Sequence, residues 1–302
     1  MLAISLFSLL SLFSHTPPAP KASYVLGEVQ VETRTIAVPG HAQPELDRTL
    51  IFTGAIHPAT VRAVAKLMKK YPGIRRMVID SGGGDVDAAL ELSRIVKTQG
   101  WDLTVRHQCL SACANFVFPA GARKAVLPNA WVGVHETRER ILHKDGSADV
   151  VSGNEIDSAF FSRKNDEKAK DVYYARADAV RSLYRSLGIS IAFFQDYSDY
   201  ISRRKRVIGA EDVNDYPGLP GCPRFRFWAL SRQQLEQMGV TNIDSFWYPR
   251  NEAERKQLAV SSELAPGSIF LGEAKELETY CRGQALNWFA RFWLKHKSAW
   301  LG

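Results

Sequence analysis

The sequence predicts an α/β protein in which strands and helices alternate and neighbouring strands run parallel. Two observations carry this prediction. Short apolar runs such as residues 76–80 have the length and composition of buried parallel strands. Amphipathic segments such as residues 86–96 follow them with helical periodicity. Strand, turn, helix and next strand, in this order, give parallel units with right-handed connections.

The composition is that of an ordinary globular chain. Of its 302 residues, 45% are hydrophobic and 24% are charged, so the chain can bury a sizeable core. The net charge of +7 permits contact with an anionic surface without requiring it. No basic run alternates with aromatic residues as in a nucleic-acid-binding module, so we expect no nucleic-acid partner.

The N-terminal segment indicates export. Residues 2–13 form an apolar run that suits the core of a signal peptide and is short for a membrane span. No Lys or Arg precedes the run and no small-x-small cleavage site follows it, which a start further upstream would explain. We expect residues 1–22 to be a signal peptide or N-terminal anchor with its linker, and the protein to be periplasmic or otherwise extracytoplasmic. The alternative is a buried helix.

An α/β domain is expected over residues 23–250. Its first elements are one or two strands within residues 24–38, a strand at residues 49–54, and a helix over residues 58–70 that begins with proline. A Tyr-Pro-Gly turn at residues 71–73 ends this helix.

The turn after the strand at residues 76–80 holds three consecutive glycines, Gly82 to Gly84, followed by Asp85 as a helix cap. Backbone N–H groups at such a strand–turn–helix junction can bind an anion or a developing oxyanion. The Gly-Lys-Ser/Thr of a P-loop and the spacing of the dinucleotide fingerprint are both absent. The alternative is a plain tight turn without a ligand.

Ser111 is the candidate nucleophile. Residues 102–106 alternate like a strand, and a helix rich in small residues is expected to open at Cys109 and continue to Phe118. A serine at a helix N-terminus is usually only a cap. The free N–H groups at that position also suit a nucleophile whose intermediate carries an oxyanion.

His135 is the candidate base. It ends a strand at residues 131–134, which follows a Leu-Pro-Asn turn. A single histidine at a strand end is usually structural, but the interval after Ser111 allows a helix, a turn and a return strand.

Together these segments resemble the Clp protease–crotonase superfamily, on its Clp-peptidase and signal-peptide-peptidase side. The resemblance rests on the Ser-x-Gly-Gly turn, the serine at a small-residue helix start, Ala-Gly-Ala-Arg at residues 120–123, Leu-Pro-Asn-Ala, and the strand ending in His135. It covers residues 52–135 and resumes over residues 229–240. The Cys-x-Ser-Ala-Cys sequence around Ser111 is similar to an exported branch of that superfamily.

The resemblance implies a repeated β/α superhelix with a helical segment after the histidine strand. It implies that Ser111 is the nucleophile, that His135 is the general base, and that the N–H groups of Gly83 and Ala112 form the oxyanion hole. The substrate would be a peptide or protein, and no metal or cofactor would be needed.

The chain departs from the family at the acid of the triad. Clp peptidases carry that acid a few residues before the segment matched by Ser231, yet residues 216–231 contain no Asp or Glu, and Phe227 stands near the expected place. Asp212 and Asp215 are the nearest candidates, followed by Asp199 and Glu155.

This gap leaves two alternatives to an active hydrolase. The first is a catalytically degraded pseudo-enzyme that uses the same fold for binding or assembly. The second is a crotonase-type acyl-CoA enzyme, in which the glycine turn polarises a thioester and Ser111 has no required role; the expected export argues against it.

After His135 we expect a loop or hairpin at residues 137–154 and a helical segment at residues 155–201. By resemblance such helices often lie at subunit contacts, so a homo-oligomer is expected. A strand at residues 225–230 and a helix capped by Ser231 complete the domain.

Residues 251–302 are expected to form a C-terminal helical extension. Residues 284–297 are amphipathic and combine aromatic with cationic side chains. Such a segment fits a membrane-surface helix, a docked helix or an oligomer contact.

The four cysteines are Cys109, Cys113, Cys222 and Cys281, and none has zinc-ligand spacing. In an exported protein they would permit two disulfides; buried thiols are the alternative. Cys109 and Cys113 can pair only if Cys109 precedes the helix, because i and i+4 Cβ atoms on a regular helix lie about 6 Å apart.

Overall fold

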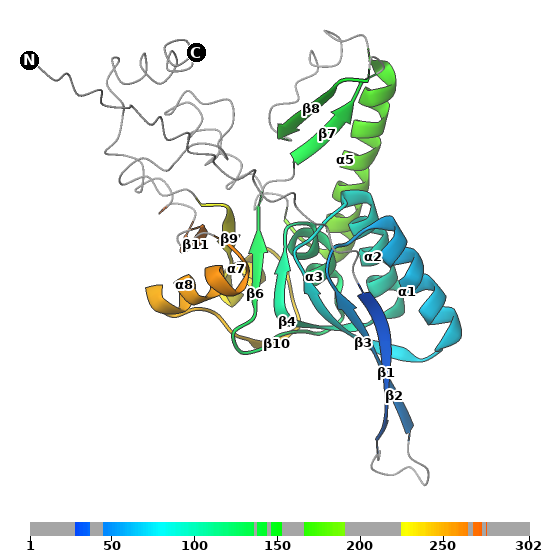
Figure 1. Cartoon of the computed structure of the whole chain (residues 1–302), viewed down its shortest axis with the longest axis vertical. Coiled ribbons are helices and arrows are strands. Elements are labelled where there is room, and N and C mark those ends of the chain that lie inside the picture. The colour runs from blue at the N-terminus through cyan, green and yellow to red at the C-terminus, as the bar shows by residue number, and fades with distance from the viewer. Residues whose placement is uncertain are drawn as a thin grey trace, which may run out of the picture.

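The computed structural model describes residues 28–36, 45–135, 138–143, 146–152, 166–190, 225–264, 268–273 and 276. Within these residues the protein is a mixed α/β structure built around one mostly parallel sheet (Figure 1). The α/β class predicted from the sequence is therefore confirmed.

In the described part of the chain the sheet has nine strands, with the order β1-β2-β3-β4-β6-β9-β11 and with β5 between β4 and β10. β2, β3, β4 and β6 run parallel, whereas β1 is antiparallel to β2 and β9 is antiparallel to β6. The strands of this sheet are Glu28–Ile36 (β1), Glu45–Thr53 (β2), Ile74–Ser81 (β3), Asp102–Leu110 (β4), Lys124–Val126 (β5), Trp131–Val134 (β6), Phe227–Ala229 (β9), Ile243–Phe246 (β10) and Ile269–Leu271 (β11).

Capping residues delimit the first two helices in the described part of the chain. Asp85 caps α2 by accepting a hydrogen bond from Ala88 N, and Gly100 ends it in the left-handed conformation with φ 61°. His57 caps α1, which has proline at its start. The helices are Pro58–Lys70 (α1), Val86–Gln99 (α2), the π-helix Cys113–Val117 (η1), Phe118–Ala120 (α3), Glu167–Leu187 (α5), Arg232–Gln237 (α7) and Glu252–Ser261 (α8).

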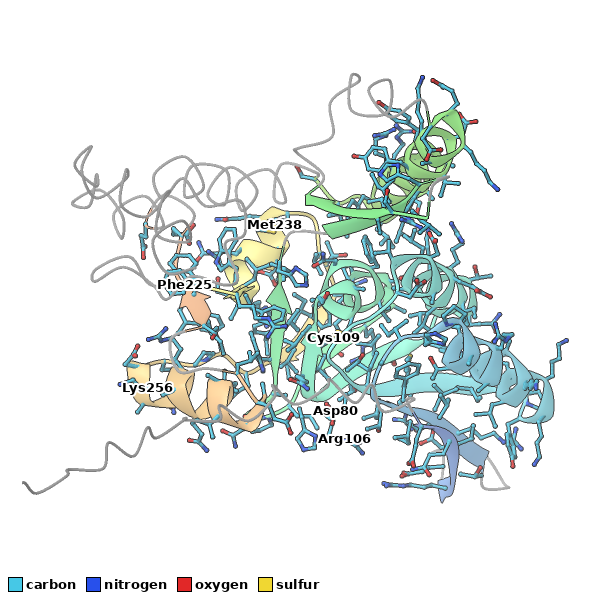
Figure 2. All side chains as sticks on the ribbon, turned by 45° about the horizontal axis from the view of Figure 1, so that its top comes forward. Asp80, Arg106, Cys109, Phe225, Met238 and Lys256 are labelled. Carbon is cyan, nitrogen blue, oxygen red and sulfur yellow. A yellow bond between two sulfur atoms is a disulfide. The ribbon has the colours of Figure 1, made fainter. Side chains whose placement is uncertain are left out.

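Both faces of the central strands are buried. Cys109 belongs to a large core cluster with side chains of α1, α2, η1 and α5, whereas its neighbour Leu110 packs with Trp131, Phe227 and Leu258 of α8. Successive strand residues point to opposite faces, so the two clusters lie on the two sides of the sheet. Figure 2 shows Cys109 in the interior and Lys256 of α8 at the periphery.

The segment after residue 250 differs from the expected helical extension. α8 is helical, but Ile269–Leu271 forms β11, which pairs in parallel with β9 at the edge of the sheet. The apolar residues of such a short run carry no periodicity that separates a strand from a helix, and pairing with β9 makes it a strand. The amphipathic stretch at residues 284–297 lies outside the described residues.

Two further elements follow the histidine strand. Arg138–Leu142 (β7) and Ala148–Ser152 (β8) form the predicted hairpin. It lies beside α5, and the β1–β2 hairpin projects on the opposite side (Figure 1). Of the helical segment expected at residues 155–201, residues 167–187 form α5, which ends at Gly188, and residues 155–165 and 191–201 lie outside the described residues. Among the helices that can be described, none is long and apolar enough to cross a membrane.

Candidate active site

Ser111 and His135 are in direct contact. Ser111 directly follows β4, and His135 directly follows β6. Because β4 and β6 are adjacent parallel strands, their carboxyl ends lie at the same edge of the sheet. The Ser111 Oγ and His135 Nε2 atoms are 2.6 Å apart, and both residues are partly buried. This is the geometry of a serine hydroxyl hydrogen-bonded to a potential base.

The backbone of Ser111 is left-handed, with φ 55°. For a residue with a Cβ atom this conformation costs on the order of 1–3 kcal/mol and persists only where surrounding contacts impose it. Two backbone hydrogen bonds do so: Ser111 N donates to Gly133 O at 2.9 Å, and Asn115 N donates to Ser111 O at 2.8 Å. The strained turn directs the hydroxyl toward His135.

The sequence placed Ser111 at the N-terminus of a helix opening at Cys109. Ser111 does precede a helix, but Cys109 is not part of that helix. β4 continues to Leu110, since Cys109 and Leu110 pair with Val132 and Gly133 of β6. Ser111 is a turn residue, Ala112 is the first helical residue, and the π-helical part runs from Cys113 to Val117. Pairing with a neighbouring strand therefore outweighs the local helix preference of the small residues.

Gly83 lies against Ser111 through the register of two strands. An irregularity places Cys109 opposite Ser81. Ser111 therefore comes next to Gly83. A Cβ atom built on Gly83, which has φ 94°, would be 2.6 Å from Ser111 Cβ and 3.0 Å from Ala112 N. Only glycine allows this approach.

The two expected oxyanion donors, the N–H groups of Gly83 and Ala112, therefore belong to backbone segments that abut each other beside Ser111. No acceptor for the Ala112 N–H is found in the described part of the chain. The Gly83 N–H donates to Ser81 Oγ at 3.1 Å, so this donor would be shared with, or released to, a bound oxyanion.

Asn115 was not among the residues selected from the sequence. Its Nδ2 donates to the backbone oxygen of His135 at 3.1 Å, and Tyr184 of α5 donates its hydroxyl to Asn115 O at 3.0 Å. Burial raises the pKa of Tyr184 well above its usual value, so this phenol stays a donor. In the sequence, Asn115 is the one polar residue in the otherwise apolar run from Ala112 to Phe118, and this could have marked it as part of the site.

The place expected for the triad acid holds an aromatic side chain. The ring of Phe227 packs edge-on against the ring of His135 with centroids 5.2 Å apart. The candidate acids Asp212 and Asp215 lie outside the described residues, as do Asp199 and Glu155, so the identity of the acid stays a prediction.

Cys109 and Cys113 form a disulfide with a Cα–Cα distance of 5.2 Å. The sequence allowed this pairing only if Cys109 precedes the helix. It does, because Cys109 belongs to the strand β4 and Cys113 to the π-helix η1. Cys222 and Cys281 lie outside the described residues.

A separate cavity of about 380 Å³ lies between β4 and α8. It includes His107, whose Nδ1 is 2.7 Å from Asp80 Oδ2, but neither Ser111 nor His135 lines it. The cavity is therefore not part of the candidate site. In the described ranges, no three His, Cys, Asp or Glu side chains are grouped so that they could hold a metal ion.

Comparisons with known proteins add little. No protein-family profile matches the sequence, and no curated protein matches it. Among solved structures, a mutant of ClpP1 from Listeria monocytogenes is similar over 66% of this chain and 91% of that chain, with 16% sequence identity and a TM-score of 0.39. A likeness this distant supports no functional assignment, and the candidate site rests on the geometry described above.

Proposed function

We propose that this chain is a serine hydrolase of the Clp protease–crotonase type, acting on a peptide or protein. The observation that carries the proposal is the 2.6 Å contact between Ser111 Oγ and His135 Nε2 at a strained strand-to-helix turn. The adjoining glycine turn supports it, since Gly83, one of the two potential oxyanion donors, abuts Ser111 and the backbone nitrogen of Ala112, the other.

In this proposal Ser111 Oγ attacks the carbonyl carbon of the scissile bond. His135 Nε2 takes the hydroxyl proton and returns it to the leaving group. The N–H groups of Ala112 and Gly83 bind the oxyanion, and Ser81 gives up its hydrogen bond from Gly83 as that charge develops. Water then hydrolyses the acyl-enzyme with His135 again acting as the base. None of these steps uses a metal or cofactor.

The proposal is tested by covalent labelling with a fluorophosphonate probe. A serine hydroxyl reacts slowly at neutral pH unless a base removes its proton, so wild-type protein should be labelled at Ser111. Ser111→Ala and His135→Ala should each abolish labelling while the circular dichroism spectrum stays native. Ser245→Ala, which alters an exposed serine of β10, is the matched control. Equal labelling of the wild type and Ser111→Ala would overturn the proposal.

The triad acid is proposed to be Asp212 or Asp215. A carboxylate on the histidine holds the imidazole tautomer and stabilises its cation, and its loss can cost several orders of magnitude in rate. Asp212→Asn and Asp215→Asn, made separately, should therefore differ: one should slow labelling at least a hundredfold and the other should not. If both react like the wild type, neither residue is the acid.

A degraded, binding-only version of the same fold is the second candidate. The observation that favours it is the Phe227 ring packed against His135 where a carboxylate was expected. A folded protein that the probe does not label, with Ser111 accessible, would favour this function over hydrolysis.

We also propose that the protein is exported, with residues 1–22 as a signal peptide or anchor. A disulfide between two fully buried cysteines supports this, because such crosslinks persist mainly in oxidising compartments. Cell fractionation of the full-length protein tests it, and recovery in the cytosol would count against it. Homo-oligomer formation and a membrane-surface contact through residues 284–297 are further proposals, tested by sedimentation and vesicle binding.

A further inference from the structure

The disulfide encloses the proposed nucleophile. Cys109 is the penultimate residue of β4 and Cys113 is the first residue of η1, so the crosslink joins the end of a strand to the start of a helix. Ser111 is the central residue of this loop and has a positive φ, whereas Ala112 is right-handed.

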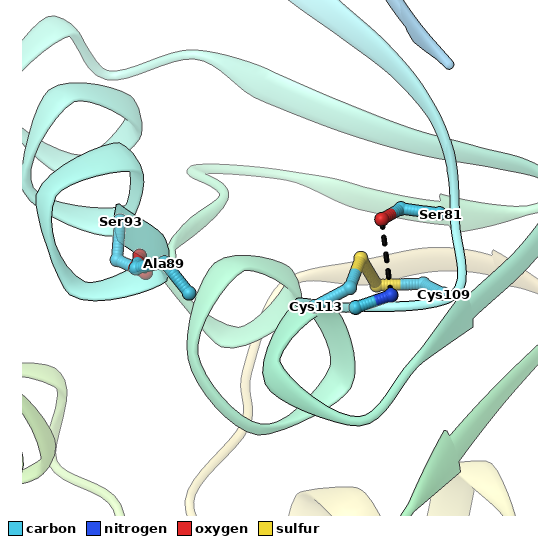
Figure 3. Close-up of a disulfide and its surroundings, with 6 residues drawn as sticks. Ser81, Ala89, Ser93, Cys109 and Cys113 are labelled. Atoms are coloured by element: carbon cyan, nitrogen blue, oxygen red, sulfur yellow. Dashed lines mark hydrogen bonds between the residues drawn. A yellow bond between two sulfur atoms is a disulfide. The ribbon is translucent and has the colours of Figure 1, made fainter. Parts of the chain in front are cut away.

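The crosslink is buried and closely surrounded. Both cysteines are 0% exposed. Figure 3 shows the disulfide next to the side chain of Ser81, the residue of β3 that pairs with Cys109. Ser81 accepts the hydrogen bond from Gly83, and Gly83 in turn abuts Ser111. The disulfide, the glycine turn and the proposed nucleophile thus form one packed unit.

We infer that the Cys109–Cys113 disulfide is a positioning crosslink. It holds Ser111 in the left-handed conformation and so keeps its Oγ in contact with His135 Nε2. This rests on the proposed function for its catalytic consequence, but its structural content is independent of that function.

The crosslink can hold Ser111 at positive φ because it limits the separation between the two ends of the loop. An L-residue at positive φ returns to negative φ when it is free to do so. Here that rotation would carry the Ser111 side chain away from His135, and backbone hydrogen bonds to Gly133 and Asn115 are the other restraints. Fixing the distance between Cys109 and Cys113 removes extended conformations of the loop. The serine is therefore held in position before any substrate binds.

The experiment uses the full chain with Cys222→Ser and Cys281→Ser, so that only Cys109 and Cys113 can respond to a reductant. To this background we add Cys109→Ala together with Cys113→Ala. The rate constant for saturating fluorophosphonate labelling should fall roughly tenfold to a hundredfold, the scale expected for a misplaced reacting group. The probe concentration for half-maximal rate should stay the same, because the surfaces that bind the probe outside residues 109–113 are retained.

Reduction supplies the second comparison. A dithiol reductant gives two electrons and two protons to the cystine, leaving two thiols and the oxidised reductant. The background protein should lose labelling rate on reduction and recover it on reoxidation. This arm also serves if the double alanine variant does not fold, and an equal rate before and after complete reduction would overturn the inference.

A spectroscopic arm separates this inference from the proposed function. In ¹⁵N NMR the Nε2 resonance of His135 should shift when the disulfide is opened, since its hydrogen bond to Ser111 is lost. A shift without labelling in either state would leave the positioning role intact and remove the nucleophile. An unchanged resonance would overturn the positioning role whether or not the protein is an enzyme.

Discussion

At the residue scale, the candidate site depends on two residues in left-handed backbone conformations. Ser111 adopts φ 55° although it carries a Cβ atom, and Gly83 adopts φ 94° next to it. The serine is held there by hydrogen bonds and a crosslink, whereas the glycine is needed because there is no room for a side chain. The two positions therefore respond differently to substitution.

Gly83→Ala should destabilise the protein and abolish labelling. The added Cβ would lie 2.6 Å from both Leu110 O and Ser111 Cβ, and alanine is strained at this φ. We expect a loss of about 2–4 kcal/mol in the free energy of unfolding from the strain and the overpacking, measured by urea denaturation. Gly82→Ala is the control. Nothing lies within 4 Å of its Cβ position, so the free energy of unfolding and the labelling rate should both stay near the wild-type values. Similar behaviour of the two variants would contradict the close approach of Gly83.

At the element scale, a short helix is secured by its first residue. α7 has only the six residues Arg232–Gln237, and Ser231 caps it as the sequence predicted. Ser231 Oγ accepts from Gln234 N at 3.2 Å, and Ser231 N donates to Gln234 Oε1 at 2.8 Å. Gln234 Nε2 also donates to Gly272 O at 2.7 Å, directly after β11. The capping box therefore fixes Gln234, which in turn anchors the end of β11.

Ser231→Ala should lower the free energy of unfolding by about 1 kcal/mol, the usual cost of removing a serine cap. Ser245→Ala, at an exposed position of β10, should change it by less than about 0.5 kcal/mol. Chemical denaturation of both variants makes the comparison. Equal stabilities would mean that α7 does not depend on its cap.

At the scale of the whole molecule, Lys124 is a buried ammonium that joins distant segments. It is 3% exposed, and its Nζ donates to Gly121 O at 2.7 Å and to Thr241 O at 2.8 Å. Burial lowers its pKa to about 8 from the usual 10.5, although the two carbonyls favour the charged form. The unfolded chain therefore binds more protons than the folded chain between these pH values, and stability rises with pH in that window.

The free energy of unfolding should accordingly gain about 1–2 kcal/mol between pH 8 and pH 10 relative to Lys124→Met. The methionine variant lacks the titrating amine and keeps the other groups, so its pH profile is the reference. Urea denaturation at the two pH values gives the difference. Parallel profiles would show that Lys124 keeps its proton throughout.

The sequence by itself determined the features set by local chemistry. The alternation of apolar runs and amphipathic segments predicted the α/β class, and Asp85 and Ser231 begin helices as predicted, because a cap depends on adjacent residues. Ser111 and His135 were selected from the sequence and are in contact.

The tertiary structure decided what depends on strand pairing. The register of β3 against β4 brings Gly83 to Ser111, and pairing with β6 keeps Cys109 in a strand, where it can reach Cys113. The role of Asn115 and the strand β11 also arise from partners far away in the sequence. Such pairings are fixed by the packing of the whole sheet, because a single strand carries little information about its register or its neighbours.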